Sequence, residues 1–355
     1  RLATGARSLA ELLRESPEAQ LGARVADEFG RDLPFLLKLL AAEEPLSLQA
    51  HPNLAQARAG FERENQARVP LDARERSYRD RNHKPELIAA LTPFHALVGF
   101  RSAQATTRLF GELAVPELAP FGAALAVVPE EQALRGFFEL LTSTKGERGR
   151  LLAEATCAAC RGKAEAGLEF SKEYAWGARI GDLYPGDPSL VLALALNLVL
   201  LEPGQAIYLP AGNLHAYLEG AGVEIMASSD NVLRGGLTPK HVDVPELLRV
   251  LDFRAGPAVL APARRRGHET EYLTPAREFA LSRLELAGQT AAIPAPAGPE
   301  VLVVTAGLLE VRRGDETVSL RGAESAFVPV EGGGYSLSGT GTAFRARVNI
   351  PAPSS

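Results

Sequence analysis

Four side chains that could bind a metal ion stand at the edges of predicted strands: Gln49, His51, Glu86 and His215. Two imidazoles with a carboxylate and an amide oxygen suit a divalent ion such as Zn²⁺. A catalytic site of this kind would keep one coordination position open for water or substrate. The sequence therefore predicts a Lewis-acid metal centre if these four residues come from strands of one barrel.

Two groups suited to proton transfer occur near these candidates. Lys84 lies two residues before Glu86 in a polar cluster, residues 78–86, which by composition alone favours a solvated loop over an active-site loop. Glu224 lies in an alternating stretch that sends it to the face opposite its apolar neighbours. Burial in a dry cleft could bring the pKa of either group near neutrality, and the sequence does not decide between them.

Cations for an anionic substrate are found in a loop rich in glycine and proline. Arg234 and Lys240 are its basic residues, and Ser47 shares a predicted strand face with Gln49. The chain carries a net charge of -5, so it would not attract an anion globally. An anionic substrate must therefore be held by local cations, although a solvated loop is the simpler interpretation of any single Arg or Lys.

The candidate ligands Gln49 and His51 belong to an alternating stretch, residues 45–52. Strand geometry sends these two side chains to one face and Leu48 and Ala50 to the other. The alternative is a strand with a polar solvent face.

His215 follows a pair of turns in the stretch Glu202–Tyr217, which predicts two short strands joined by a turn. The spacing of Gly204, Pro210, Gly212 and His215 resembles the second signature motif of the cupin barrels, in which the histidine points inward to a metal. A single histidine on an apolar strand is more often a hydrogen-bonded core residue, so the other ligands are needed for the metal hypothesis.

The remaining elements must position these residues. Helical periodicity covers residues 8–15 and 25–40, where Pro34 would start the last helix. Residues 102–172 are rich in alanine and predict several short helices. The apolar run 190–201 is interpreted as a buried strand, which places the helices as an insertion between strands.

The C-terminal part predicts short strands separated by glycines, typical of a second small barrel. The stretch Gly322–Pro329 has the Gly-to-Pro spacing of the first barrel, but no histidine follows it. We therefore expect no metal in this part. The basic run Arg264–Arg266 is interpreted as a solvated linker without a function.

These patterns predict a mainly β fold with a helical insertion, composed of two cupin-type (jelly-roll) β-barrels, the first catalytic, and an α-helical domain. The expected parts are the first portion of the catalytic barrel (1–101), the inserted helical domain (102–175), the second portion of the catalytic barrel (176–255) and the C-terminal cupin-like domain without metal (256–355).

Composition narrows the class of protein. Hydrophobic residues make up 46% and charged residues 23%, as in soluble globular proteins, and the negative net charge gives no reason to expect nucleic acid as a partner. The longest apolar run is shorter than the roughly 20 residues that span a membrane. Cys157 and Cys160 are interpreted as helix-packing thiols, which fits an expected location in the reducing cytoplasm.

Four motifs in the same order resemble the type I mannose-6-phosphate isomerases of the cupin superfamily: Pro45–Pro52, Asn82–Glu86, Leu209–Tyr217 and Glu224–Lys240. The resemblance covers residues 30–250. It implies one zinc ion bound by Gln49, His51, Glu86 and His215, an essential arginine at Arg234, and the reversible conversion of mannose 6-phosphate to fructose 6-phosphate. A monomer is expected.

The chain departs from the family pattern in two places. Family members begin with a segment that contains Tyr-x-Trp-Gly and Ala-Glu-x-Trp elements, whereas this chain starts with Arg1, so the N-terminal strands of the catalytic barrel are expected to be missing. In addition, Glu219 stands where the cupin motif has asparagine.

Isomerisation of an aldose to a ketose needs a base, stabilisation of an enediolate and a holder for the phosphate. Glu224 or Lys84 is the expected base, and Lys240 with Ser47 would join Arg234 at the phosphate. Two alternatives are a metal-binding cupin that senses sugars without catalysis and a non-haem iron oxygenase. Gln49 as a ligand argues against redox iron.

Overall fold

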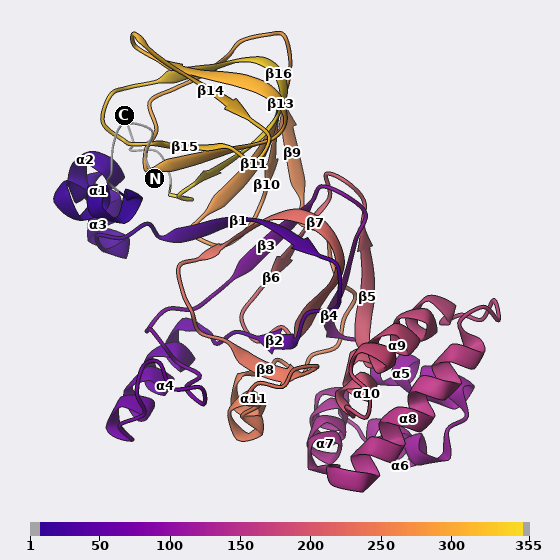
Figure 1. Ribbon diagram of the computed structural model, residues 1–355. Helices are drawn as coiled ribbons and strands as arrows, with labels where there is room; N and C mark the ends of the chain where they lie inside the picture. The colour runs from indigo at the N-terminus through magenta and orange to yellow at the C-terminus, as the bar shows by residue number, and fades with distance from the viewer. Residues whose placement is uncertain (1–7, 351–355) are drawn as a thin grey trace.

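The computed structural model describes residues 8–350 and contains two eight-stranded sheets and a block of helices. Figure 1 shows one barrel above the other, with the helices beside the lower barrel. The mainly β fold with a helical insertion is thus confirmed. Within residues 8–350, no helix is both long and apolar enough to cross a membrane.

The lower barrel contains the candidate ligands, and its strands are β1 (Phe35–Ala42), β2 (Leu48–Ala50), β3 (Glu86–Ala90), β4 (Phe94–Phe100), β5 (Leu196–Leu201), β6 (Ala206–Leu209), β7 (His215–Ala227) and β8 (Leu233–Gly236). The long strand β7 pairs with β1, β2, β3 and β4. Gln49 lies opposite His215 in this pairing, and Glu86 lies opposite Met226. Strands distant in the sequence therefore meet on β7.

Three local predictions were wrong. Residues 35–40 form strand β1 and not a helix, because the whole segment pairs antiparallel with β7, from Phe35 opposite Ala227 to Ala42 opposite Gly220. The apolar run 190–201 is divided between helix α10 (Ser189–Leu194) and strand β5, since a short, almost entirely apolar run has no periodicity to distinguish the two. The basic run Arg264–Arg266 lies in a strand that pairs with residues 269–271.

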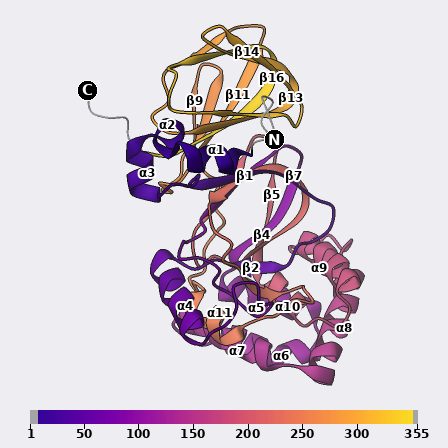
Figure 2. The same ribbon diagram turned by 60° about the vertical axis from the view of Figure 1, so that its left-hand side comes forward.

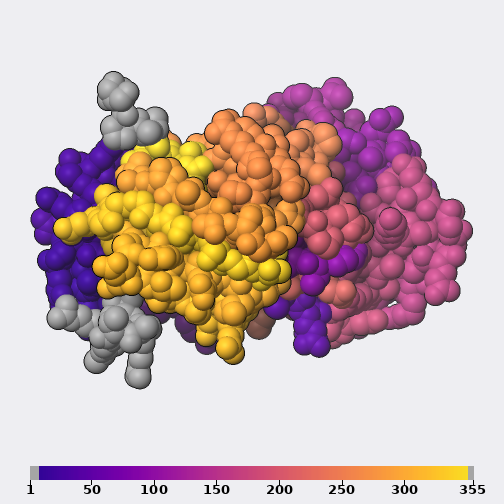
Figure 3. All heavy atoms as spheres, turned by 90° about the horizontal axis from the view of Figure 1, so that it is seen from above, coloured from indigo at the N-terminus to yellow at the C-terminus, as the bar shows by residue number. Residues whose placement is uncertain are grey.

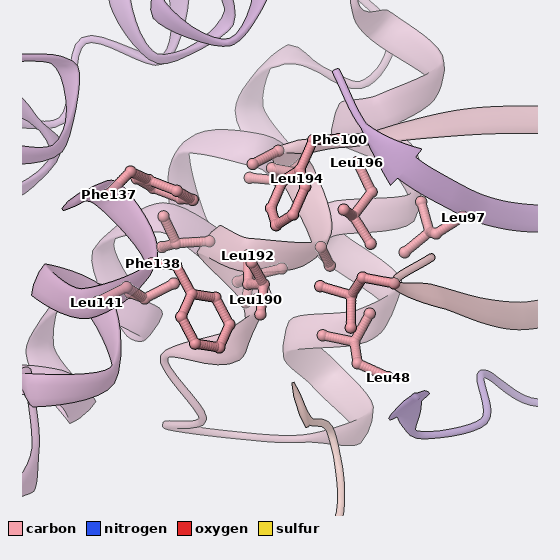
Figure 4. Packing of buried hydrophobic residues seen from close by; sticks show 14 of the residues in the cluster. Leu48, Leu97, Phe100, Phe137, Phe138, Leu141, Leu190, Leu192, Leu194 and Leu196 are labelled. Atoms are coloured by element: carbon pink, nitrogen blue, oxygen red, sulfur yellow. The ribbon is translucent and has the colours of Figure 1, made fainter. Parts of the chain in front are cut away.

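The helical block is formed by α5 (Ala103–Leu113), η1 (Pro116–Leu118), α6 (Ala119–Leu125), α7 (Glu130–Ser143), α8 (Gly146–Lys163), α9 (Ser171–Leu183) and α10 (Ser189–Leu194). Its apolar core continues into the end of the lower barrel, as Figure 4 shows for Leu192 and Leu194 between Phe138 and Leu97. The block is therefore fixed to the barrel by a shared core. In Figure 1, helix α11 (Val244–Val250) lies below the lower barrel, and helix α4 (Leu54–Gln66) lies at its lower left, across from the block at the lower right.

The two cysteines pack between α8 and α9, as predicted. Cys160 is fully buried, and both thiols are free. They face Gly177 and Gly181, where an added Cβ would lie 2.8 Å and 2.5 Å from the sulfur atoms of Cys160 and Cys157. The glycines thus permit the close approach of the two helices.

The upper barrel contains β9 (Ala263–Arg266), β10 (Glu269–Tyr272), β11 (Ala280–Ala287), β12 (Ala291–Ile293), β13 (Glu300–Arg313), β14 (Glu316–Arg321), β15 (Ser325–Val328) and β16 (Tyr335–Arg347). Phe279, Leu281 and Phe344 belong to the same buried apolar cluster as Val223 and Ile225 of the lower barrel. The two barrels therefore share one apolar interface.

Three short helices precede the first strand, α1 (Leu9–Glu15), α2 (Pro17–Leu21) and α3 (Ala23–Phe29). Leu13, Leu21 and Val25 are buried in the core between the barrels. Figures 2 and 3 show these indigo helices against the C-terminal barrel, far from the helical block. The N-terminal part thus supports the interface between the barrels.

Candidate active site

Three buried side chains converge at one edge of the lower barrel. Their ligand atoms, from His51, Glu86 and His215, all lie within 4.8 Å of one another. Glu86 is the first residue of β3 and His215 the first of β7, whereas His51 directly follows β2. The Nε2 atoms of His51 and His215 are each 3.3 Å from an oxygen of Glu86. The structure thus places three of the four predicted ligands in one cluster.

Main-chain carbonyls orient the two imidazoles. Nδ1 of His51 is 2.8 Å from the carbonyl oxygen of Asn231, and Nδ1 of His215 is 3.0 Å from that of Asn213. Since a carbonyl only accepts, each Nδ1 carries a proton, and in the neutral form of the ring Nε2 keeps a free lone pair. Both lone pairs therefore face the Glu86 carboxylate, which is also an acceptor.

Acceptors that face one another repel unless a proton or a cation lies between them. Nε2 of His51 is buried and has no hydrogen-bond partner among residues 8–350. A buried polar atom without a partner is unfavourable by itself. Two imidazole nitrogens and a carboxylate are also the donor types that zinc prefers, so these residues fit a zinc ion.

Burial and nearby charged groups shift the pKa values of His51 and Glu86 in the directions that favour metal binding. Burial lowers the pKa of His51, which favours the neutral imidazole. Burial would raise the pKa of Glu86, but His51, His215 and Lys84 lower it well below its ordinary value. Burial thus favours the neutral imidazole of His51, and the neighbouring groups favour the ionised carboxylate of Glu86.

Gln49 lies beside this cluster but makes a different contact. It is opposite His215 on one side of β2 and opposite Arg234 on the other. Its amide nitrogen donates to the hydroxyl of Ser47 at 3.3 Å. The amide oxygen of Gln49, which is the atom that could bind a metal, is not used in this hydrogen bond.

The two candidate bases differ in their environment. Lys84 is buried, with its ammonium 3.3 Å from Glu86. Glu224 is also buried, and its pKa is raised by burial and by the charge of Glu86, against the effect of Lys38. Lys84 is thus engaged as the partner of a ligand, whereas Glu224 is a carboxylate with increased basicity.

Two residues near Glu224 were missed by the sequence analysis. Lys38 lies opposite Glu224 in the pairing of β1 with β7, and its ammonium is 3.4 Å from the carboxylate. In the sequence, Lys38 is noticeable as the single charged residue in the apolar run 35–40. The helix prediction for this run did not assign its side chain to any face. Tyr217 is buried, and its hydroxyl has no hydrogen bond within the described part of the chain. Burial and the charges of Glu224 and Glu86 raise the pKa of Tyr217.

The predicted anion-binding residues all line one cavity of about 520 Å³. They are Ser47, Arg234 and Lys240, and Gln49 lines the same cavity. Within residues 8–350, neither cation pairs with a carboxylate. Burial and the like charge of Arg79 lower the pKa of Arg234. His51, Glu86 and His215, here named the metal-type cluster, do not line this cavity, and Gln49, which is opposite His215, lies between the cluster and the cavity.

Comparisons with known proteins agree on one family. Residues 4–103 match the family model "Phosphomannose isomerase type I, catalytic domain". A mannose-6-phosphate isomerase of Salmonella typhimurium is 38% identical over 339 residues, which are 94% of this chain and 83% of the relative. Mannose-6-phosphate isomerase 2 of Arabidopsis thaliana is 35% identical, over 88% of this chain and 71% of the relative.

Solved structures give the same relationship. A crystal structure of a zinc-bound mannose 6-phosphate isomerase superposes with a TM-score of 0.87 at 36% identity, covering 97% of this chain and 86% of that one. A phosphomannose isomerase variant from Salmonella typhimurium has a TM-score of 0.88 at 36% identity, with the same coverage.

Proposed function

We infer the function of this chain from the premise that it belongs to the type I phosphomannose isomerase family. The chain is a zinc-dependent isomerase that interconverts mannose 6-phosphate and fructose 6-phosphate. The observation that carries this function is the buried cluster in which the Nε2 atoms of two imidazoles face the carboxylate of Glu86.

We propose that one zinc ion per chain is held by four side chains: Gln49, His51, Glu86 and His215. Zinc, when bound, polarises sugar oxygens as a Lewis acid and lowers the pKa of the carbon acid. The chain contributes the orientation of the ligands, because the carbonyls of Asn231 and Asn213 fix both imidazoles. Support for Gln49 is its place opposite His215 and its amide oxygen.

We propose Glu224 as the base of the reaction. Its carboxylate would take the proton from C2 of the aldose and return it to C1, while the hydroxyl proton moves from O2 to O1. The intermediate is an enediolate, and C2 becomes the ketone carbon. A raised pKa makes Glu224 a stronger base than an exposed carboxylate. Lys38 balances its charge, and Lys84 stays paired with Glu86.

The phosphate group is proposed to bind in the cavity of Ser47, Arg234 and Lys240. A phosphate dianion would give both cations the anionic partner that they lack among residues 8–350. Arg234 also lies opposite Gln49, so it is the cation closer to the proposed metal ligands in the strand register. It would therefore act both on the phosphate and on charge that develops during the reaction.

We also propose the domain division 1–101, 102–175, 176–255 and 256–355, with no metal in the last part. Strands β9 to β16 lie within that part and share an apolar interface with the lower barrel, which supports a covering role. The proposed location is the cytoplasm, supported by two free thiols. The proposed state is a monomer, and mannose 6-phosphate and fructose 6-phosphate are the proposed partners.

The test is the metal content of the purified chain together with an assay that couples fructose 6-phosphate formation to a visible reaction. We expect zinc and turnover of mannose 6-phosphate. Metal without turnover would identify a sugar-binding module, and bound iron with oxygen consumption would identify an oxygenase. Either outcome overturns the proposal.

A further inference from the structure

Two loops meet beside the metal-type cluster. One is the loop of residues 77–85, between α4 and β3, and the other is the loop of residues 228–232, between β7 and β8. The first leads directly into Glu86, and the second supplies the carbonyl of Asn231 that accepts from His51. Two of the proposed zinc ligands thus depend on how these loops lie relative to each other.

The side chain of Asn231 is bonded entirely to the opposite loop. It is fully buried. Its oxygen accepts from the main-chain nitrogens of Arg79 and Asp80 at 2.7 Å and 3.1 Å. Its nitrogen donates to the main-chain oxygens of Asp80 and Asn82 at 2.9 Å and 2.8 Å. All the hydrogen-bonding capacity of this amide is therefore used across the contact between the loops.

Asp80 makes the reciprocal contact. Its carboxylate accepts from the hydroxyl of Ser229 at 2.9 Å and from the main-chain nitrogen of Asp230 at 2.7 Å. It also accepts from the main-chain nitrogen of Asn82 at 2.8 Å. The hydroxyl of Ser229 accepts in turn from the main-chain nitrogen of Asn231 at 3.2 Å. Asp80, Ser229 and Asn231 thus form a closed network, here named the loop clasp.

We propose that the loop clasp is a positioning device for the zinc site. By joining the two loops, it holds the carbonyl of Asn231 against Nδ1 of His51, so that Nε2 of His51 stays directed at Glu86. None of the three side chains contacts the Nε2 atoms or the carboxylate of the cluster in the described part of the chain. The clasp therefore acts through His51 and not on the substrate. This inference rests on the proposed function for the identity of the metal.

A positioning role differs from a purely structural role in what it changes. Groups that orient a metal-binding histidine typically alter metal affinity or activity by about 10-fold to 100-fold when they are replaced. If the clasp only supports folding, its loss would lower the melting temperature of the metal-free protein and leave the zinc affinity of the folded fraction unchanged. Zinc affinity is therefore the decisive readout.

The experiment compares Asp80→Asn, Ser229→Ala and Ser229→Thr with the wild type. Zinc dissociation constants are measured by competition with a chelator, and the visible absorption of Co²⁺-loaded protein reports the geometry of the site. Asp182→Asn is the matched control, because Asp182 is an exposed aspartate on α9 that pairs with Arg161.

We expect a dissociation constant on the order of 10-fold to 100-fold weaker for Asp80→Asn, and a smaller loss for Ser229→Ala. A changed Co²⁺ spectrum should accompany both losses. Ser229→Thr keeps the hydroxyl and should restore the affinity, and Asp182→Asn should match the wild type. Excess zinc should recover most of kcat in the clasp variants.

Unchanged zinc affinity and an unchanged Co²⁺ spectrum in the folded variants would overturn the inference. If Asp80→Asn does not fold, the comparison of Ser229→Ala with Ser229→Thr still decides. A wild type that binds zinc but does not isomerise mannose 6-phosphate would refute the proposed function alone, because the affinity measurements need no turnover.

Discussion

The two cations of the cavity, Arg234 and Lys240, allow the proposed phosphate site to be tested by substitution. Lys240→Ala removes an exposed ammonium, and Arg234→Gln removes a half-buried guanidinium while keeping a polar side chain. Both groups lack a carboxylate partner among residues 8–350, so their charge is available to a phosphate. The substitutions should therefore weaken substrate binding and not break an internal ion pair.

The burial of each cation sets the expected magnitude. A hydrogen bond to a charged group contributes about 1.5–3 kcal/mol, and water weakens it at exposed positions. For exposed Lys240 we expect the lower value, which corresponds to roughly a tenfold increase in KM with little change in kcat. For Arg234 we expect about 3 kcal/mol, or on the order of a 100-fold loss in kcat/KM, with kcat also reduced.

The assay compares mannose 6-phosphate with unphosphorylated mannose for each variant, by coupled detection of the ketose product. The wild type should strongly prefer the phosphorylated sugar, and both variants should lose most of that preference. Arg265→Ala, which removes an exposed cation from the upper barrel, is the control and should change neither rate. If both variants keep the wild-type kcat/KM for mannose 6-phosphate, the phosphate binds elsewhere and the reasoning fails.

Three further predictions concern the metal, the base and the helical block. Chelation should abolish activity and lower the melting temperature, because it leaves Nε2 of His51 without a partner in the described part of the chain, and added zinc should restore both. A chelated sample with full activity would refute the metal centre. Activity should be present above the pKa of Glu224 and lost as pH falls through it. Because burial raises this pKa, the acid limb of the kcat/KM profile should lie above the pKa of about 4.3 for an exposed glutamate. Glu224→Gln should lower kcat and remove this limb, and zinc content measured at each pH should stay constant if the limb belongs to the base. Gly181→Ala should lower the free energy of unfolding by about 1–3 kcal/mol, because its Cβ would lie 2.5 Å from the sulfur of Cys157, whereas Gly122→Ala has open space and should not destabilise the fold in urea titrations.

The fold class was predictable because its signals are local. Turn residues around His215 and the alternation of residues 45–52 predicted strands that the structure contains. The alanine-rich region predicted helices for the same reason. These features depend on neighbours within a few residues, so a single sequence is enough to read them.

The first strand was not predictable because its signal is not local. Residues 35–40 are apolar at spacings that a helix also allows, and only pairing with β7 makes them a strand. The error also hid Lys38, since its position opposite Glu224 exists only in that pairing. Because the segment was predicted as a helix, Lys38 was not included among the candidate site residues, although it is present in the sequence as a charged residue in an apolar run.

The polar cluster of residues 78–86 shows why composition could not separate a solvated loop from an active-site loop. Some of its polar groups form hydrogen bonds with Ser229 and Asn231, which are far away in the sequence. The residues next to the cluster therefore give no indication of whether the loop is solvated or part of an active site. A buried amide such as that of Asn231 must find partners, and here it finds them on the loop that leads to Glu86. Because the same residue also holds His51, the hydrogen bonds of one asparagine couple two metal-type ligands that the sequence separates by 34 other residues.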